Sequence, residues 1–188
     1  MRNTDWFNYG GVYREVELFE TPQTVIRDLF LYLDDDGIHV EAAVDGPATQ
    51  AKLAIPRLDL ATTLTLTNGR AQTILQAQPD LWSPENPVLY DVTLSAGGDS
   101  VGDRVGFRRI ERRGTRILLN GQPVFLRGIS VHEDDELQGK LTSEADIRRR
   151  FAHARELGCN FLRLAHYPRH ERAARIADVV GLMGWEEV

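Results

Sequence analysis

The chain has 188 residues, of which 42% are hydrophobic and 27% charged, a balance typical of folded proteins with a buried core. Its formal net charge of −6 argues against nucleic acid or an anionic membrane as a partner. Five histidines and a single cysteine show no zinc-binding spacing, so we expect no metal, no cofactor and no intrachain disulfide. The sequence contains no apolar signal core and no apolar run long enough to cross a membrane.

The N-terminal stretch has the pattern of one strand. Val12, Val16 and Leu18 fall at even spacing after the glycine pair Gly10-Gly11, so we expect a strand here. A single strand cannot form a core by itself. The alternative interpretation is an N-terminal arm that packs on the domain that follows.

Residues 25–107 have an all-β pattern of seven short apolar runs separated by turn signals. Seven strands in such a length predict an immunoglobulin-like β-sandwich. No catalytic grouping occurs in this span, which favours a structural spacer over a binding role. The runs are Val25–Leu33, Ile38–Val44, Lys52–Ile55, Leu58–Leu66, Ala71–Leu75, Val88–Leu94 and Val101–Phe107.

The periodicity then changes to that of an α/β protein. Residues 116–126 predict a hairpin with an Asn120-Gly121 turn, whose second arm continues into a strand at 127–132. A helix is expected from a capping motif at Ser143 to Gly158, and a second helix through Val180 to Gly181. Strands are expected at 160–165 and 182–188. Strand, helix, strand, helix, strand is the pattern of a parallel sheet. A closed barrel needs eight such strands, so the chain would contain less than half of one.

Polar side chains follow the ends of these parallel strands. His132 leads into the acidic residues Glu133–Glu136, which form either a solvated loop or a site for sugar hydroxyls. The next strand, an apolar run expected to be buried on both faces, contains Arg163 and is followed by His166. A guanidinium in such a strand needs a carboxylate or a ligand, so a satisfied ion pair is the simpler interpretation. Cys159 is expected to be a small buried hydrophobe.

Two motifs carry a specific resemblance. Asn160-x-x-Arg163-x-x-His166-Tyr167-Pro168, preceded by Arg127-Gly128-x-x-x-His132-Glu133-Asp134, resembles the family-2 glycoside hydrolases, which include β-galactosidases, β-glucuronidases and β-mannosidases. The segments Asp5–Gly11 and Leu81–Tyr90 also resemble that family. The chain departs from it at Val131, where the family often has Arg or Asn.

The resemblance implies three parts. Residues 1–22 would be the last strand of a mostly missing jelly-roll, 23–108 an immunoglobulin-like sandwich, and 109–188 the start of a TIM (β/α)8 barrel. It also implies a fragment of a retaining exo-β-glycosidase, inactive alone, because the family's acid/base and nucleophile glutamates would lie beyond Val188, on later barrel strands. Glu186 and Glu187 would match the third-strand acid, so no catalytic residue is assigned.

By the same resemblance, His132 and Asp134 would contact sugar hydroxyls, Arg163 would orient the nucleophile, and His166 would line the same subsite. The implied partner is a carbohydrate substrate, and the longer protein would be a homo-oligomer. Two alternatives stay open. One is a non-catalytic carbohydrate-binding or scaffolding module built on this fold, and the other is a sandwich joined to an α/β piece with no link to sugars.

Overall fold

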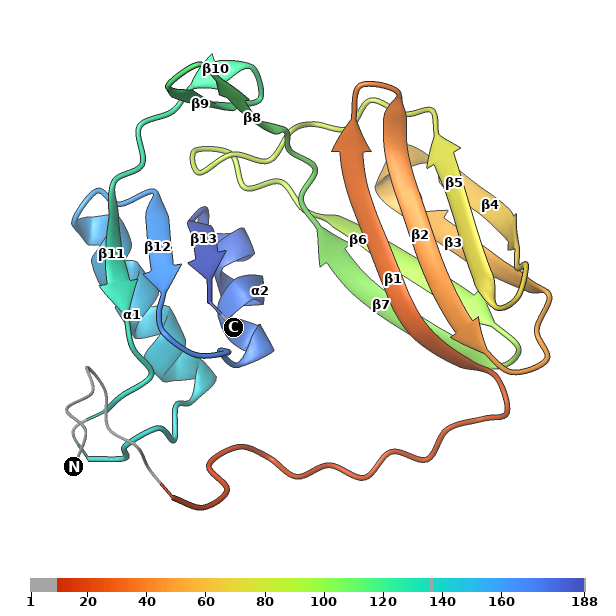
Figure 1. Ribbon diagram of the computed structural model, residues 1–188, viewed down its shortest axis with the longest axis horizontal. Coiled ribbons are helices and arrows are strands. Elements are labelled where there is room, and N and C mark those ends of the chain that lie inside the picture. The colour runs from red at the N-terminus through yellow and green to blue at the C-terminus, as the bar shows by residue number, and fades with distance from the viewer. Residues whose placement is uncertain (1–9, 136, 188) are drawn as a thin grey trace. The chain divides into compact units, whose positions relative to one another are not determined.

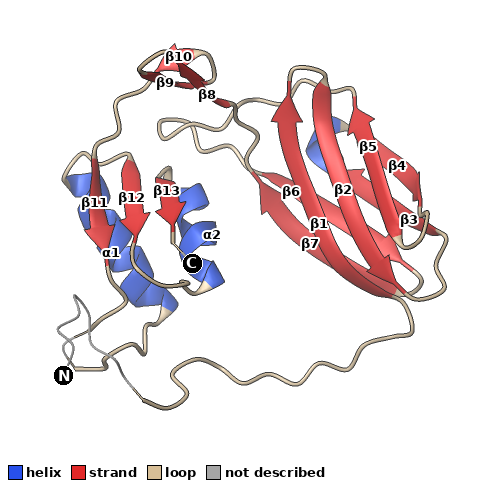
Figure 2. Cartoon of the chain, viewed as in Figure 1, coloured by secondary structure: helices blue, strands red, loops and turns tan. Residues whose placement is uncertain are grey.

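The computed structural model describes residues 10–135 and 137–187. Contacts between residues divide the chain into two compact units. The sandwich unit comprises Phe19–Val124. The barrel unit joins the residues before Phe19 to Phe125 and the residues after it. Strands dominate the sandwich unit, whereas both α-helices belong to the barrel unit (Figure 2).

The sandwich unit contains the seven expected strands in two antiparallel sheets. One sheet has the order β1-β2-β5 and the other β4-β3-β6-β7 (Figure 1). A 3₁₀ turn, Pro56–Leu58, leads into β4. The strands are β1 (Val25–Asp34), β2 (Gly37–Asp45), β3 (Gln50–Ile55), β4 (Leu60–Thr65), β5 (Arg70–Leu75), β6 (Tyr90–Ala96) and β7 (Asp99–Val105). The predicted sandwich is confirmed, and its strand ends differ from the expected ones by a few residues.

The core of the sandwich unit forms where alternate side chains of both sheets turn inward. Ile38 and Val40 from one sheet and Leu53 and Leu94 from the other are all nearly inaccessible to solvent. Burial of each such side chain is worth about 1.5–3 kcal/mol. The alternation of buried and exposed residues in β6 is the period-2 pattern that revealed these strands in the sequence.

Two segments differ from the sequence-based expectations. A short strand, β8 (Ile110–Arg113), joins the expected hairpin of β9 (Arg116–Leu119) and β10 (Gln122–Pro123) in a third sheet. All four residues of β8 are exposed, so the sequence there shows no apolar alternation that would have predicted it.

The expected N-terminal strand is wrong, because residues 10–24 adopt no strand and Val12, Val16 and Leu18 are all highly exposed. Without a neighbouring strand to bond, an apolar alternation cannot become a sheet. Residues 1–9 lie outside the described part of the chain.

The barrel unit contains the expected parallel sheet. Its strands are β11 (Gly128–Val131), β12 (Phe161–Leu164) and β13 (Met183–Glu186), and β12 lies between the other two. Helices α1 (Glu144–Glu156) and α2 (Glu171–Val180) cover one face of the sheet (Figure 1). Against them β12 buries Leu162 and Leu164, together with Phe151 and Ile176 of the helices.

The last strand of this sheet is shorter than the sequence suggested. A strand was expected over 182–188, whereas β13 begins at Met183 and ends at Glu186. Val188 lies outside the described residues, so the part of the expectation that falls on it is not tested. The strand ends where Glu187 turns its side chain to partners on the neighbouring strand end.

The other face of the parallel sheet carries Ser130, Arg163 and Trp185, which pair across the strands and stay partly or largely exposed. The expectation that β12 is buried on both faces is therefore wrong for the described residues, which bury only the face toward the helices. Cys159 is buried in the core between helices and sheet, as predicted.

The helix ends follow from the sequence signals. Ser143 caps α1 in a reciprocal capping box with Asp146, and Gly181 ends α2 with a left-handed backbone (φ 74°). Gly158, also left-handed at φ 74°, follows the end of α1. Ser143 thus marks where α1 begins, and the two glycines mark the ends of α1 and α2, shortly before β12 and β13. No helix in the described residues is long and apolar enough to cross a membrane.

Limited proteolysis should separate the two units. Among the described residues, β11 and β13 each pair with β12 alone, so each leaves one row of backbone groups without a strand partner. We expect trypsin to cut the barrel unit first and to leave a resistant core within Phe19–Val124. Mass spectrometry of the early products measures the order of cleavage. Equal protection of both units would contradict this expectation.

Candidate functional site

The candidate site lies at the carboxyl end of the parallel sheet. Val131, Leu164 and Glu186 are paired across the three strands, so the residues that follow them emerge at the same edge. His132 follows β11, Ala165 and His166 follow β12, and Glu187 follows β13. This is the edge at which α/β barrels carry their binding and catalytic groups.

Arg163 is held by two partners at this edge. Its Nε donates to Glu187 Oε1 at 2.7 Å, and its Nη2 lies 3.2 Å from His166 Nδ1. His166 Nδ1 is also 3.1 Å from Glu187 Oε2. Burial alone would raise the pKa of Glu187, but hydrogen bonds from Arg163 and His166 outweigh it and hold that pKa below its ordinary value. Of the two interpretations left open for Arg163, a carboxylate partner within the chain exists, and Glu187 supplies it.

His132 and Asp134 face the same cluster. His132 Nδ1 lies 3.7 Å from Asp134 Oδ2, and the His132 ring meets the His166 ring edge-on at 5.4 Å between centroids. Burial, assisted by the charge of Arg169, lowers the pKa of His132, while Asp134 opposes the shift. Asp134 Oδ1 is buried and accepts no hydrogen bond from any described residue. The pair offers an imidazole and a carboxylate, both of which suit hydroxyl groups.

Asp134 should control the titration of His132. Replacing Asp134 with Asn removes the negative charge that favours imidazolium, so the pKa of His132 should fall further below 6.5. An NMR titration of the His132 ring protons measures the midpoint. The matched change Asp91→Asn, on β6 of the sandwich unit, should leave that midpoint where it is. A midpoint that rises in Asp134→Asn would show that the carboxylate does not face the imidazole.

Glu133 is the buried anchor beneath these residues, with 4% of its surface exposed. Its Oε2 accepts from Arg14 Nη2 at 3.0 Å and its Oε1 from the backbone N–H of His170 at 3.0 Å. Its backbone N–H donates to the Tyr167 hydroxyl at 2.9 Å, and its carbonyl accepts from Thr142 Oγ1 at 2.9 Å. One residue thus ties the end of β11 to the N-terminal arm, the β12–α2 loop and the segment before α1.

Basic side chains surround Tyr167. Lys140 Nζ lies 3.5 Å from the centre of its ring, and the Arg169 guanidinium lies 4.8 Å from it. Arg169 is itself buried and donates from Nη2 to the carbonyl of Ala165 at 2.7 Å. Burial raises the pKa of Tyr167, so the phenol stays neutral and keeps its bond from Glu133.

The structure brings together all four residues singled out in the sequence, which are His132, Asp134, Arg163 and His166. Sequence reasoning missed Glu187 as the partner of Arg163, and it missed the ion pair of the buried Glu133 with the partly exposed Arg14. The solvated interpretation of the acidic residues is wrong for Glu133. Glu136 lies outside the described residues. Local sequence could not reveal the Arg14 contact, because it spans 119 positions.

The catalytic pair is the part of the expected site that the described residues do not test. The acid/base and nucleophile glutamates were expected beyond Val188, and Val188 itself lies outside the described residues. Their position therefore stays a prediction. At the described end of the sheet, the acids Glu186 and Glu187 are both engaged within the chain, by the backbone of Arg169 and by the side chain of Arg163 respectively.

Comparisons with known proteins agree with this geometry. Residues 25–108 match the model of "Glycosyl hydrolases family 2", and residues 110–188 match "Glycosyl hydrolases family 2, TIM barrel domain". A β-galactosidase of Arthrobacter sp. (strain B7) is 32% identical over 91% of this chain and 17% of its own length. A β-glucuronidase of Paenibacillus borealis is 28% identical over 98% of this chain and 32% of its own length.

Solved structures give the same picture. The apo structure of Bacteroides uniformis β-glucuronidase 3 has a TM-score of 0.84 and 29% identity, covering 98% of this chain and 26% of that one. The galacturonate-bound family-2 β-galacturonidase of Eisenbergiella tayi has a TM-score of 0.75 and 27% identity, covering 89% and 33%. The chain therefore spans about a sixth to a third of these relatives' length. With a sandwich and the first three strands of a TIM barrel, this chain belongs to glycoside hydrolase family 2.

Proposed function

We propose that this chain is a segment of a retaining exo-β-glycosidase that hydrolyses terminal β-linked galactosides, glucuronides or mannosides. One observation carries the proposal. His132, Asp134, Arg163 and His166 converge at the carboxyl edge of a parallel sheet, in a chain whose relatives include β-galactosidases and β-glucuronidases. Residues 23–108 serve in it as a spacer, and residues 109–188 contribute part of the sugar site.

Each polar residue has a role that fits its surroundings. The Asp134 carboxylate, 23% exposed, accepts a hydrogen bond from a sugar hydroxyl, and His132 donates to or accepts from the neighbouring one. Arg163 orients the carboxylate of a nucleophile that comes from a later strand. Arg163 already binds one carboxylate of this chain, that of Glu187 at 2.7 Å, which supports a role in holding a carboxylate. His166 lines the same subsite and keeps Arg163 in place.

The chemistry itself needs two further carboxyl groups. Retention of configuration requires a nucleophile and an acid/base group roughly 5–5.5 Å apart across the glycosidic bond. We assign neither role to this chain and place both beyond Val188. Glu187 is engaged by Arg163 and His166, while Glu186 accepts from the backbone N–H of Arg169 at 3.3 Å. Both acids therefore serve the architecture of the site in this proposal.

An activity assay combined with the downstream coding sequence tests the proposal. The chain of 188 residues should not hydrolyse chromogenic β-galactosides, β-glucuronides or β-mannosides. A longer product that includes an Asn-Glu pair after a later apolar strand should hydrolyse at least one of them. Turnover by the 188-residue chain that disappears in Glu186→Gln or Glu187→Gln would overturn our assignment. A longer product that contains both glutamates yet binds sugars without hydrolysis would favour a non-catalytic module.

A further inference from the structure

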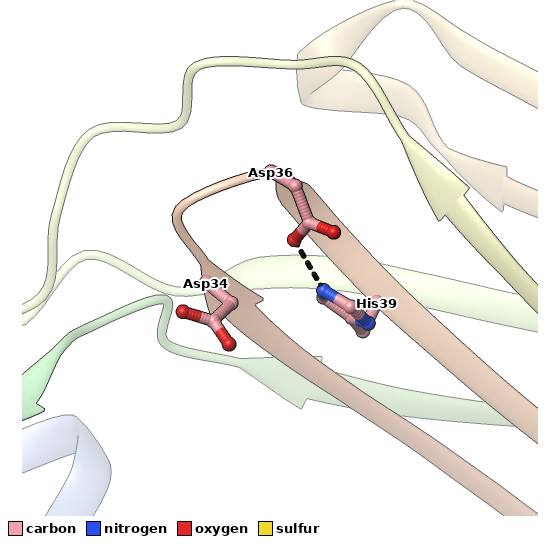
Figure 3. Close-up of side chains that lie close together, drawn as sticks. All are labelled: Asp34, Asp36 and His39. Carbon is pink, nitrogen blue, oxygen red and sulfur yellow. Dashed lines mark hydrogen bonds and ion pairs between the residues drawn. The ribbon is translucent and has the colours of Figure 1, made fainter.

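A second polar cluster lies in the sandwich unit, at the turn between β1 and β2. Asp34 ends β1, Asp36 lies in the turn, and His39 is in β2 (Figure 3). His39 pairs with Tyr32 of β1 across the two strands. Asp34 and Tyr32 are two apart along β1, so their side chains leave the sheet on one face, which His39 shares. One ligand atom from each of Asp34, Asp36 and His39 lies within 4.8 Å of the others.

The spacing suits direct coordination of a small divalent ion. Two ligand atoms of a tetrahedral zinc site with bonds of about 2.0–2.2 Å lie roughly 3.4 Å apart. His39 Nε2 and Asp36 Oδ1 are already 2.6 Å apart, so an ion would separate them slightly as it displaces the shared proton. Asp34 is exposed and has one ligand atom within 4.8 Å of those of Asp36 and His39, while its Oδ1 accepts from the backbone N–H of Asp35 at 2.8 Å.

The imidazole is held in place before any ion binds. The His39 ring stacks on the Tyr32 ring with centroids 4.6 Å apart and planes 10° apart. Gln76 Nε2 donates to the carbonyl of Asp36 at 2.8 Å, which ties the turn to the segment after β5. A ligand whose ring is already oriented loses less entropy on binding, and so binds more tightly.

The charges around the turn favour a cation. Asp34, Asp35 and Asp36 are consecutive. The Arg109 guanidinium pairs with Asp35 Oδ1 at 2.8 Å and donates to the backbone carbonyl of Asp34 at 2.6 Å, so it binds neither the Asp34 nor the Asp36 carboxylate in these contacts. Sequence reasoning searched for cysteine and histidine spacing and passed over this Asp-x-Asp-x-x-His pattern.

We propose that Asp34, Asp36 and His39 form a binding site for zinc or a similar divalent transition-metal ion, separate from the candidate sugar site. Imidazole nitrogen with carboxylate oxygen is a donor set that suits Zn²⁺. Mg²⁺ and Ca²⁺ prefer sites made of oxygen alone with more ligands. The ion would clamp the β1–β2 turn and thereby stabilise the sheet formed by β1, β2 and β5. Solvent completes the coordination, because the cluster is open on its outer side.

Calorimetric titration of the whole chain, freed of metal with EDTA, tests this site with ZnCl₂. Wild type should bind Zn²⁺ in a saturable step that MgCl₂ at equal concentration does not reproduce. His39→Gln and Asp36→Asn should each weaken that step at least tenfold. Asp28→Asn, an acid on the same strand β1, is the matched control and should bind as wild type does. Thermal melts without metal confirm that each variant is folded.

Histidines of the barrel unit could also take zinc, so the site must be assigned directly. In wild type, the ring resonances of His39 should shift with the first equivalent of ZnCl₂. Zn²⁺ should also raise the melting temperature of wild type and not that of His39→Gln. The proposal is overturned if His39→Gln binds Zn²⁺ as tightly as wild type, or if the His39 resonances do not respond.

Discussion

Replacing Glu133 with alanine should destabilise the barrel unit by about 2–3 kcal/mol. The change removes a buried carboxylate that accepts from Arg14 and from the backbone N–H of His170. It leaves the partly buried N–H of His170 without its acceptor, whereas Arg14, whose side chain is 34% exposed, can still reach water. We expect this loss to fall below the full cost of breaking a wholly buried pair for that reason. Urea unfolding followed by hydrogen exchange of peptides from β12 and β13 measures it.

A matched variant separates burial from ion pairing. Glu144→Ala removes the exposed pair with Arg148 on α1, whose side chains are each about half exposed. That change should cost no more than about 0.5 kcal/mol. Peptides from β1 to β7 should exchange at the wild-type rate in both variants, since Glu133 belongs to the barrel unit. Equal losses for Glu133→Ala and Glu144→Ala would refute the anchoring role of Glu133.

Arg163→Leu should have opposite consequences in two settings. In the 188-residue chain it should change stability little, because Arg163 is 40% exposed and Glu187 can be hydrated when the guanidinium is gone. In a longer product that carries the nucleophile, it should reduce kcat about 100-fold while the protein stays folded, because the nucleophile is no longer oriented. Steady-state kinetics with a chromogenic substrate and a thermal melt measure both effects.

Arg148→Leu is the control for Arg163→Leu, since it deletes an exposed arginine on α1 without touching the strand ends. It should leave kcat and stability close to wild type. A large loss of stability in Arg163→Leu would assign that residue a structural role instead. Unchanged kcat in Arg163→Leu would remove it from the proposed sugar site.

The elements of the fold were predictable where local pattern and burial coincide. Strand β6 alternates buried and exposed residues, and α1 carries both halves of its capping box within four residues. The prediction of a strand around Val16 was wrong, because these residues pair with no other strand in the described part of the chain. Strand β8 was missed because hydrogen bonds to β9 hold it, with no buried side chain to mark it.

The candidate site was predictable only in part. His132 and His166 end parallel strands, and that position alone brings them together. The partner of Arg163 could not be chosen from sequence, since Asp134, Glu186 and Glu187 all end neighbouring strands. The structure selects Glu187 by where the chain turns after β13. Glu133 gave no signal, because one acid among four consecutive ones has nothing local to distinguish it as buried.

The Arg14–Glu133 contact also constrains the order of events during synthesis. Its two residues are 119 positions apart, and the whole sandwich unit lies between them. The ribosome therefore synthesises all of the sandwich unit before it adds Glu133, and domains that emerge first fold first. Arg14 can form this contact only after the end of β11 and the start of α2 have been synthesised. We infer that the barrel unit closes last, and that its assembly is slowed by the long loop this contact has to close.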